Sequence, residues 1–321
     1  MVQYAESWLQ IEAASGGRPV FQGSVDDIRA MFAGLHEALK PGYPPITDAV
    51  RSTDGEAQGV KYRVYNPNPA TAPGPLPLGL FMHGGGYLMG NLETEDFLCR
   101  AIAEQSRTVV VSVDYRLAPE NKHPTQLRDT MVVLEWAYEN ASKIGADPTR
   151  LYTIGTSAGG TLALNAAREI INARSKVPRS SLRGIIAVGP VTLHPDHVPA
   201  PYREAYNSYT EFAEGAPALT RKTMTEFFEH AGMAKDDASA FILLNGKNSF
   251  AGFPPVHITT SEADPLRDDG VVLGKVLREA GVEVRENQLK GLPHAYWFFN
   301  TLPEFPGFLG EVVGGIRWVV G

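Results

Sequence analysis

The chain has 321 residues, of which 43% are hydrophobic, so it can bury a large core and is neither a disordered nor a fibrous protein. Its formal net charge at pH 7 is -7, with 29 Lys and Arg residues against 36 Asp and Glu residues. No cluster of basic residues forms a stripe that could bind a phosphate backbone, which excludes nucleic acid as an expected partner.

Cys99 is the only cysteine, so no disulfide can form within the chain and no cysteine-based metal cage can be built. Residues 1–17 lack the basic and apolar segments of a secretion signal, and no apolar run approaches the roughly 18 residues of a membrane span. We therefore expect a cytoplasmic protein without a membrane span. The sequence leaves the oligomeric state open, and a homodimer is one of the alternatives.

Residues 24–39 predict the first clear helix. Apolar side chains recur at helical spacing, Ser24 can serve as the N-cap, and Asp27 stands three residues later. The prolines that follow end this helix, and a strand-forming region begins near residues 60–65.

Short apolar runs then alternate with longer helical patterns. The runs occupy residues 78–82, 109–113, 151–154, 184–188 and 256–259. Runs that are apolar on both faces and separated by helices predict a parallel sheet covered on both sides. Residues 191–253 break this alternation, because they are rich in Tyr, Phe, Pro and acidic residues and contain no convincing strand, which predicts a helical insertion.

A G-x-S-x-G motif centred on Ser157 follows one apolar run and precedes a helical pattern. This order is typical of a nucleophile elbow, in which the serine lies on a strained turn at the carboxyl end of the sheet. Gly155 and Gly159 would leave room for close backbone contacts. We predict that Ser157 is the nucleophile; the alternative is a glycine-rich turn without a chemical role.

Upstream, His83-Gly84-Gly85-Gly86 follows another apolar run, at the position from which such loops supply oxyanion donors. We predict an oxyanion hole made by the backbone N–H groups of Gly85, Gly86 and Ala158. His83 is expected to fix the loop and not to act as a general base. A phosphate-binding loop is the alternative, but the Gly-Lys-Ser/Thr that it requires is missing.

His294 lies on a turn after the strand-like residues 282–289, where an imidazole could take the serine proton. Asp264 follows the last apolar run and precedes Pro265, which disfavours helix, so its carboxylate is expected to orient the imidazole. The competing acids are Glu262, Asp268 and Asp269. The order serine, aspartate, histidine is the order found in α/β-hydrolases.

Two other groups are ambiguous. His194 and His197 could suggest a metal, but Pro195 opposes a regular helix and no further ligand is marked, so we expect a solvated loop. Six aromatic residues of the insertion could line the substrate pocket or could simply pack the insertion on itself. They are Tyr202, Tyr206, Tyr209, Phe212, Phe227 and Phe228.

Five ordered motifs resemble those of the hormone-sensitive-lipase-like carboxylesterases, also called bacterial family IV. They are HGGGYLMG at 83–90, DYRLAPEN at 114–121, GTSAGG at 155–160, DPLRDDG at 264–270 and the turn at His294. The resemblance covers roughly residues 55–321. It implies an α/β-hydrolase fold, with a mostly parallel eight-stranded sheet, helices on both faces and a helical cap.

The resemblance also divides the chain, with the cap built from residues 1–50 and 191–253 and the core from residues 51–190 and 254–321. It implies that Asp114, Tyr115, Arg116 and Glu120 are structural residues near the oxyanion loop. The family commonly has Asp before the nucleophile, where this chain has Thr156. That difference leaves open whether the contact made by the Asp of the family is present in this chain.

The function that the resemblance implies is hydrolysis of short- to medium-chain carboxylic esters through an acyl-enzyme intermediate, without a cofactor or metal. The expected partner is a small-molecule ester. One alternative is a catalytically silent ligand-binding protein on the same fold, like the gibberellin receptors. Another is an amidase or lactonase that uses the same triad.

Overall fold

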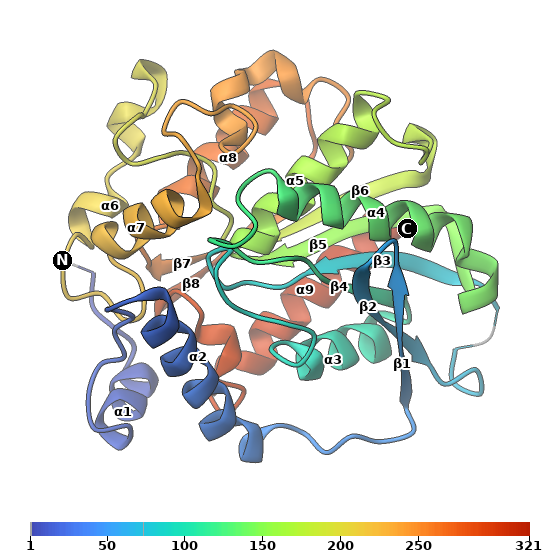
Figure 1. Ribbon diagram of the computed structural model, residues 1–321, viewed down its shortest axis with the longest axis horizontal. Helices are drawn as coiled ribbons and strands as arrows, with labels where there is room; N and C mark the ends of the chain where they lie inside the picture. The colour runs from blue at the N-terminus through green and yellow to red at the C-terminus, as the bar shows by residue number, and fades with distance from the viewer. Residues whose placement is uncertain (1, 73) are drawn as a thin grey trace.

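The computed structural model describes residues 2–72 and 74–321, which form an eight-stranded sheet between layers of helices (Figure 1). The strands are β1 (Val50–Ala57), β2 (Val60–Pro67), β3 (Leu76–Met82), β4 (Val109–Asp114), β5 (Ala146–Thr156), β6 (Leu182–Val188), β7 (Val256–Ala263) and β8 (Val284–Pro293). The α-helices are α1 (Glu6–Ala14), α2 (Val25–Leu39), α3 (Asp96–Ser106), α4 (Thr125–Glu139), α5 (Ala158–Ile171), α6 (Ser208–Glu211), α7 (Arg221–Ala231), α8 (Arg267–Glu279) and α9 (Phe305–Val320).

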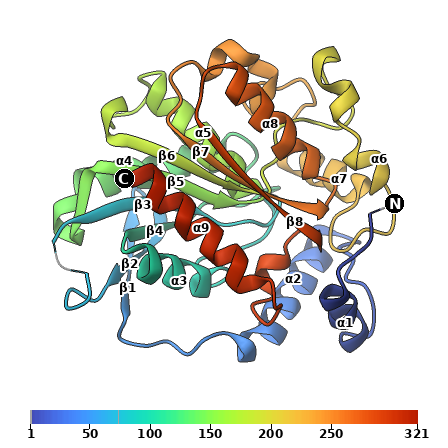
Figure 2. The ribbon, with the colours of Figure 1, turned by 180° about the vertical axis from the view of Figure 1, so that it is seen from behind.

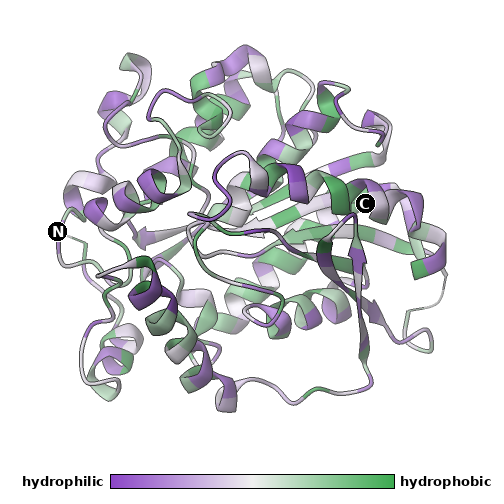
Figure 3. Ribbon diagram, viewed as in Figure 1, coloured by the Kyte–Doolittle hydropathy of each residue, from purple (hydrophilic) through white to green (hydrophobic). Residues whose placement is uncertain are grey.

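The sheet has the order β1-β2-β4-β3-β5-β6-β7-β8. Strands β4, β3, β5, β6, β7 and β8 pair in parallel, whereas β2 pairs antiparallel with both β1 and β4. Every residue of β3 is buried, and the central strands in Figure 3 are largely hydrophobic. The prediction of a mostly parallel sheet, apolar on both faces, is therefore confirmed.

Helices cover both faces of the sheet. Helices α4, α5 and α8 lie on one face, while α3 and α9 cover the other, where α9 runs across the sheet (Figures 1 and 2). The approach of α9 is close, because a Cβ added at Gly184 of β6 would collide with the side chain of Val319. This close contact explains the glycine in a strand that also holds Ile185, Ile186 and Val188.

The sequence predicts α2, strands β2 to β8 and helices between the strands, but it gives no expectation for β1, α1 or α9. Helix α2 has the expected capping box, in which Asp27 N donates to Ser24 Oγ over 3.2 Å and Ser24 N donates to Asp27 Oδ2 over 2.9 Å. Strand β1 was not predicted, because only Val50 and Ala57 at its ends are buried and it lies at the edge of the sheet. Helix α1 also has no clear signal, since Trp8 is its only buried residue.

Between β6 and β7 the described chain forms only helices, turns and loops, apart from one isolated bridge. That bridge joins Val20 to Ala218, and Ala218 N donates to Pro19 O over 2.8 Å. The N-terminal segment and the insertion therefore meet, and α1, α2, α6 and α7 gather beyond the carboxyl ends of the strands (Figure 1). The division into a cap and a core stays a prediction. Among the described residues, no helix is both long enough and apolar enough to cross a membrane.

Candidate active site

Ser157 occupies a strained turn between β5 and α5. Its φ of 53° and ψ of -121° are unfavourable for a residue with a Cβ. The turn is held because Ser157 N donates to Val188 O over 2.7 Å. A Cβ at Gly155 would collide with Gly159 O, and a Cβ at Gly159 would collide with Met82 O. The glycines of the motif are thus required by close backbone contacts, as the sequence predicts.

The structure brings together the three side chains of the predicted triad. His294 Nε2 lies 2.9 Å from Ser157 Oγ, and His294 Nδ1 lies 2.7 Å from Asp264 Oδ2. The other oxygen of Asp264 accepts a hydrogen bond from Leu266 N over 2.8 Å. All three side chains are buried. An imidazole between a hydroxyl and a carboxylate can accept the hydroxyl proton while the carboxylate holds the proton on Nδ1.

The competing acids are engaged elsewhere. Glu262 accepts a hydrogen bond from Gly291 N over 2.9 Å, so it braces the turn that precedes His294. Asp268 accepts hydrogen bonds from Asn207 N and Ser208 N. Asp269 accepts hydrogen bonds from Thr192 N, Leu193 N and Tyr206 Oη. Burial raises the pKa of Asp269 to about 7. Asp268 and Asp269 thus fix loops of the insertion, and none of the three competing acids reaches the imidazole.

The glycine loop after β3 lies beside Ser157. Gly84, Gly85 and Gly86 line the same cavity as Ser157, and Gly85 and Gly86 have φ angles of 116° and 59° that favour glycine. Within the described part of the chain, the N–H groups of Gly85, Gly86 and Ala158 donate to no other protein group. Free backbone amides next to a nucleophile can stabilise a developing oxyanion, and Ala158 also begins a helix.

His83 is held in the loop and does not face the serine. Its Nδ1 lies 2.7 Å from Gly84 O, and its ring stacks on Tyr115 with the centroids 4.1 Å apart. Tyr115 Oη donates to His83 O over 2.8 Å. Burial lowers the pKa of His83 to about 4, so the imidazole is neutral at pH 7. These contacts support the structural role that the sequence suggests for His83 and Tyr115.

Other residues of the segment that follows β4 connect the loop to the surrounding helices. Arg116 pairs with Asp129 of α4 over 2.7 Å. Glu120 pairs with Arg29 of α2 over 2.8 Å, and Arg29 also donates to Leu88 O, just beyond the glycines. Helix α2 is thereby tied to the glycine loop.

Glu95 is a buried residue of the site that the sequence analysis missed. Thr156 Oγ1 lies 2.9 Å from Glu95 Oε2, and Gly84 N donates to the same oxygen over 2.9 Å. The carboxylate therefore links Thr156, the residue before Ser157, to the glycine loop. Thr156 supplies a hydroxyl donor, and the acid comes from the start of α3. Glu95 lies in a polar stretch of sequence, where no pattern separates a buried acid from a solvated one.

Burial raises the pKa of Glu95 from 4.5 to about 7, and its hydrogen bonds from Gly84 and Thr156 offset this only in part. The folded protein thus holds this proton more tightly than the unfolded chain does. The stability that the proton contributes is fully present below about pH 4.5 and is lost as the pH rises through about 7.

Glu95→Gln keeps the shape of the side chain and stays neutral at every pH. We expect the free energy of unfolding of the wild type to fall relative to this variant by up to about 1.4 kcal/mol per pH unit between pH 4.5 and 7. Urea unfolding of both proteins across that range measures the difference. Glu104→Gln, an exposed change on the same helix, should follow the wild type. Parallel profiles for Glu95→Gln and the wild type would contradict this role of burial.

The cavity beside Ser157 is small and apolar. Apart from Ser157, His294 and the glycines, it is lined by Phe21, Phe32, Met89, Ala218, Leu219, Met224, Phe227, Ala295, Trp297 and Phe298. Of the six aromatic candidates, only Phe227 is among these residues. Tyr206 instead donates to Asp269, and Phe228 packs against Phe241. The N-terminal segment supplies lining residues that the sequence did not indicate.

The expected solvated loop at His194 is also wrong in part. The side chain of His194 is buried against Phe228 and Phe241, and its Nδ1 accepts a hydrogen bond from Asp196 N over 3.1 Å. Nowhere in the described ranges do three or more His, Cys, Asp or Glu side chains form a group that could hold a metal.

The α/β-hydrolase fold family matches residues 79–298 of the chain. The versiconal hemiacetal acetate esterase of Dothistroma septosporum is 42% identical over 99% of this chain and 95% of its own length. Esterase LipI of Mycobacterium tuberculosis is 32% identical over 86% of this chain and 83% of its own length.

Among solved structures, vibralactone cyclase superposes with a TM-score of 0.86 at 30% identity, covering 99% of this chain and 95% of that protein. The similarity to the Dothistroma esterase and to vibralactone cyclase extends over 99% of this chain. The chain therefore belongs to the hormone-sensitive-lipase-like carboxylesterases of the α/β-hydrolase fold and is a carboxylic ester hydrolase.

Proposed function

We propose that the protein is a serine esterase in which Ser157 is the nucleophile, His294 the general base and Asp264 the acid that orients the base. The observation that carries this proposal is the continuous set of short contacts, 2.9 Å from Ser157 Oγ to His294 Nε2 and 2.7 Å from His294 Nδ1 to Asp264 Oδ2. Gly85, Gly86 and Ala158 supply the oxyanion donors.

The reaction has two acyl transfers. Ser157 Oγ attacks the ester carbonyl as its proton passes to His294 Nε2, and the carbonyl oxygen becomes an oxyanion held by the free amides. The C–O bond to the alcohol then breaks, and His294 returns the proton to the leaving alkoxide. A water molecule, deprotonated by His294, attacks the acyl-enzyme, and the carboxylic acid leaves as Ser157 regains its proton.

The small, apolar cavity favours esters of short acyl chains. The Dothistroma relative, which is 42% identical to this chain, is named as an esterase of versiconal hemiacetal acetate, an acetate ester. We therefore infer that the acyl group is small, with acetyl esters among the best substrates.

A panel of p-nitrophenyl esters from acetate to decanoate tests this assignment. We expect kcat/KM to be highest for the shortest acyl chains and to fall by about tenfold or more at decanoate, because the apolar cavity beside Ser157 is small. A matched ester and anilide pair, together with a lactone, distinguishes an esterase from an amidase or lactonase. Strong activity on long-chain emulsified lipids alone, or faster cleavage of the anilide, would contradict the proposal.

A further inference from the structure

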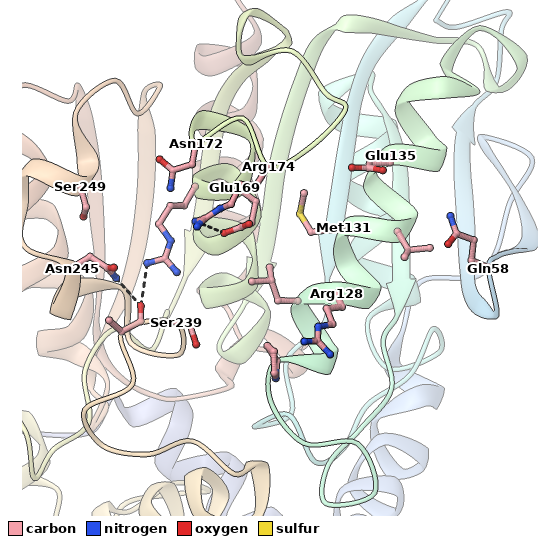
Figure 4. A pocket seen from close by; sticks show the side chains of 15 residues that line it. Gln58, Arg128, Met131, Glu135, Glu169, Asn172, Arg174, Ser239, Asn245 and Ser249 are labelled. Atoms are coloured by element: carbon pink, nitrogen blue, oxygen red, sulfur yellow. Dashed lines mark hydrogen bonds and ion pairs between the residues drawn. The ribbon is translucent and has the colours of Figure 1, made fainter.

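A second cavity lies apart from Ser157, between α4, the end of α5 and residues 238–249 (Figure 4). It is an open groove of about 680 Å³, and it shares no lining residue with the cavity at Ser157. One wall is apolar, with Leu127, Met131 and Val132 on α4. The other walls carry arginine, amide and hydroxyl groups. The groove therefore offers both an apolar surface and hydrogen-bond donors.

Arg168 of α5 is the buried polar group of this groove. The residue is only 6% exposed, its Nη1 donates to Ala238 O over 3.2 Å, and its Nε has no hydrogen-bond partner among the residues that the structure describes. Asn245 Nδ2 donates to the same carbonyl over 2.7 Å. In the described ranges Arg168 forms no ion pair. A buried guanidinium without a carboxylate is costly, and burial lowers the pKa of Arg168 accordingly.

The carboxylates of the groove are already engaged. Glu169 pairs with Arg174 over 2.8 Å, and Figure 4 shows these two side chains joined. Glu135 accepts from Ser175 Oγ over 3.2 Å and lies 3.7 Å from Lys176 Nζ.

Arg128, which projects from α4 across the groove from Asn245, forms no ion pair with the described residues either. The charged residues that line the groove are Arg128, Arg168, Arg174, Glu135 and Glu169. The lining therefore has an excess of one positive charge.

We propose that this groove binds a small organic carboxylate, with its anionic group paired to Arg168 and its apolar chain along Leu127, Met131 and Val132. A guanidinium presents a planar fork of donors that matches a carboxylate, and Arg128 lies close enough to the groove to contribute to the field. One negative charge balances the excess charge of the lining. The apolar wall on α4 favours an anion with a hydrocarbon body over an inorganic ion.

Hexanoate is a suitable probe, and calorimetric titration into the full chain measures its binding. A phosphonate first blocks Ser157, so that hexanoate cannot occupy the catalytic cavity. Failure of Ser157 to react would count against the proposed catalytic role; the titration would then compare the untreated wild type with Arg168→Met, because Arg168 does not line the catalytic cavity. We expect saturable binding of hexanoate, with acetate and hexan-1-ol each binding about tenfold more weakly because one lacks the chain and the other the charge.

Arg168→Met removes the charge and retains a side chain of similar apolar length. Its affinity for hexanoate should fall by about tenfold or more. Arg183→Met is the control, because the exposed Arg183 also donates to a backbone carbonyl, Thr149 O, and does not line the groove. This control should bind hexanoate as the wild type does.

The melting temperature separates ligand binding from a structural role of Arg168. Since Arg168 has no carboxylate partner in the described part of the chain, Arg168→Met should melt at or above the wild-type temperature. If that variant fails to fold, Arg168→Lys keeps the charge but loses the fork, and it should still bind hexanoate more weakly. Equal affinity of the Arg168 variants and the wild type, or equal binding of hexan-1-ol and hexanoate, would overturn the proposal.

Discussion

Ester hydrolysis by Ser157→Ala is expected to fall by about 10⁶-fold in kcat, the loss seen when serine hydrolases lose their nucleophile. The substitution removes only Oγ, so the amides of Gly85, Gly86 and Ala158 can still bind substrate. Without a hydroxyl 2.9 Å from His294 Nε2, no acyl-enzyme can form. Initial rates on p-nitrophenyl acetate at high enzyme concentration measure the residual turnover.

The control for this experiment is Ser181→Ala. Ser181 is also a buried serine, but it precedes β6 at the end of the sheet away from Ser157. It should retain near-wild-type activity, and both variants should show the circular dichroism of the wild type. Hydrolysis by Ser157→Ala at a rate near that of Ser181→Ala would exclude Ser157 as the nucleophile.

Asp264→Asn should lower kcat by about 10⁴-fold, as the corresponding change does in other serine hydrolases. The amide oxygen can still accept from Leu266 N, so the amide nitrogen faces His294 Nδ1 in place of the carboxylate. An N–H donor there forces the histidine proton onto Nε2. A protonated Nε2 can no longer accept the proton of Ser157. The substitution therefore changes the tautomer with little change in shape.

Glu262→Gln provides the comparison for that result, because Glu262 is the acid that braces the turn before His294 through Gly291 N. An amide oxygen can accept the same hydrogen bond, so we expect activity within about tenfold of the wild type. Kinetics of the two variants on one ester distinguish the acids. A larger loss for Glu262→Gln than for Asp264→Asn would show that Glu262, and not Asp264, orients His294, and would contradict the proposed triad.

The elements predicted well from sequence are those whose packing imposes a pattern on a short stretch of residues. The parallel strands β3, β4 and β6 appear as continuous apolar runs because both their faces are covered. The elbow is marked by Gly155 and Gly159 because a Cβ at either position would collide with nearby backbone. Each signal is visible within a few residues of sequence, even where the contact that requires it is distant, as that of Gly159 with Met82 O is.

The features that the sequence missed depend on contacts between distant segments. Phe21 and Phe32 line the cavity only because the N-terminal segment folds against the insertion, where Val20 bridges to Ala218. Glu95 is buried only because α3 begins beneath the glycine loop. Apolar spacing indicates which face of α2 is covered, but not which residues cover it. The sequence around Glu95 likewise does not show which residues surround its carboxyl group in the fold.

The covalent reaction of the protein with a p-nitrophenyl phosphonate tests the central claim most directly, because the phosphonate forms a stable mimic of the tetrahedral intermediate. We expect release of one equivalent of p-nitrophenol, a parallel loss of esterase activity, and an adduct on the peptide that carries Ser157, with no adduct on Ser157→Ala. Full activity without an adduct, or an adduct on another residue that accounts for the lost activity, would contradict the mechanism.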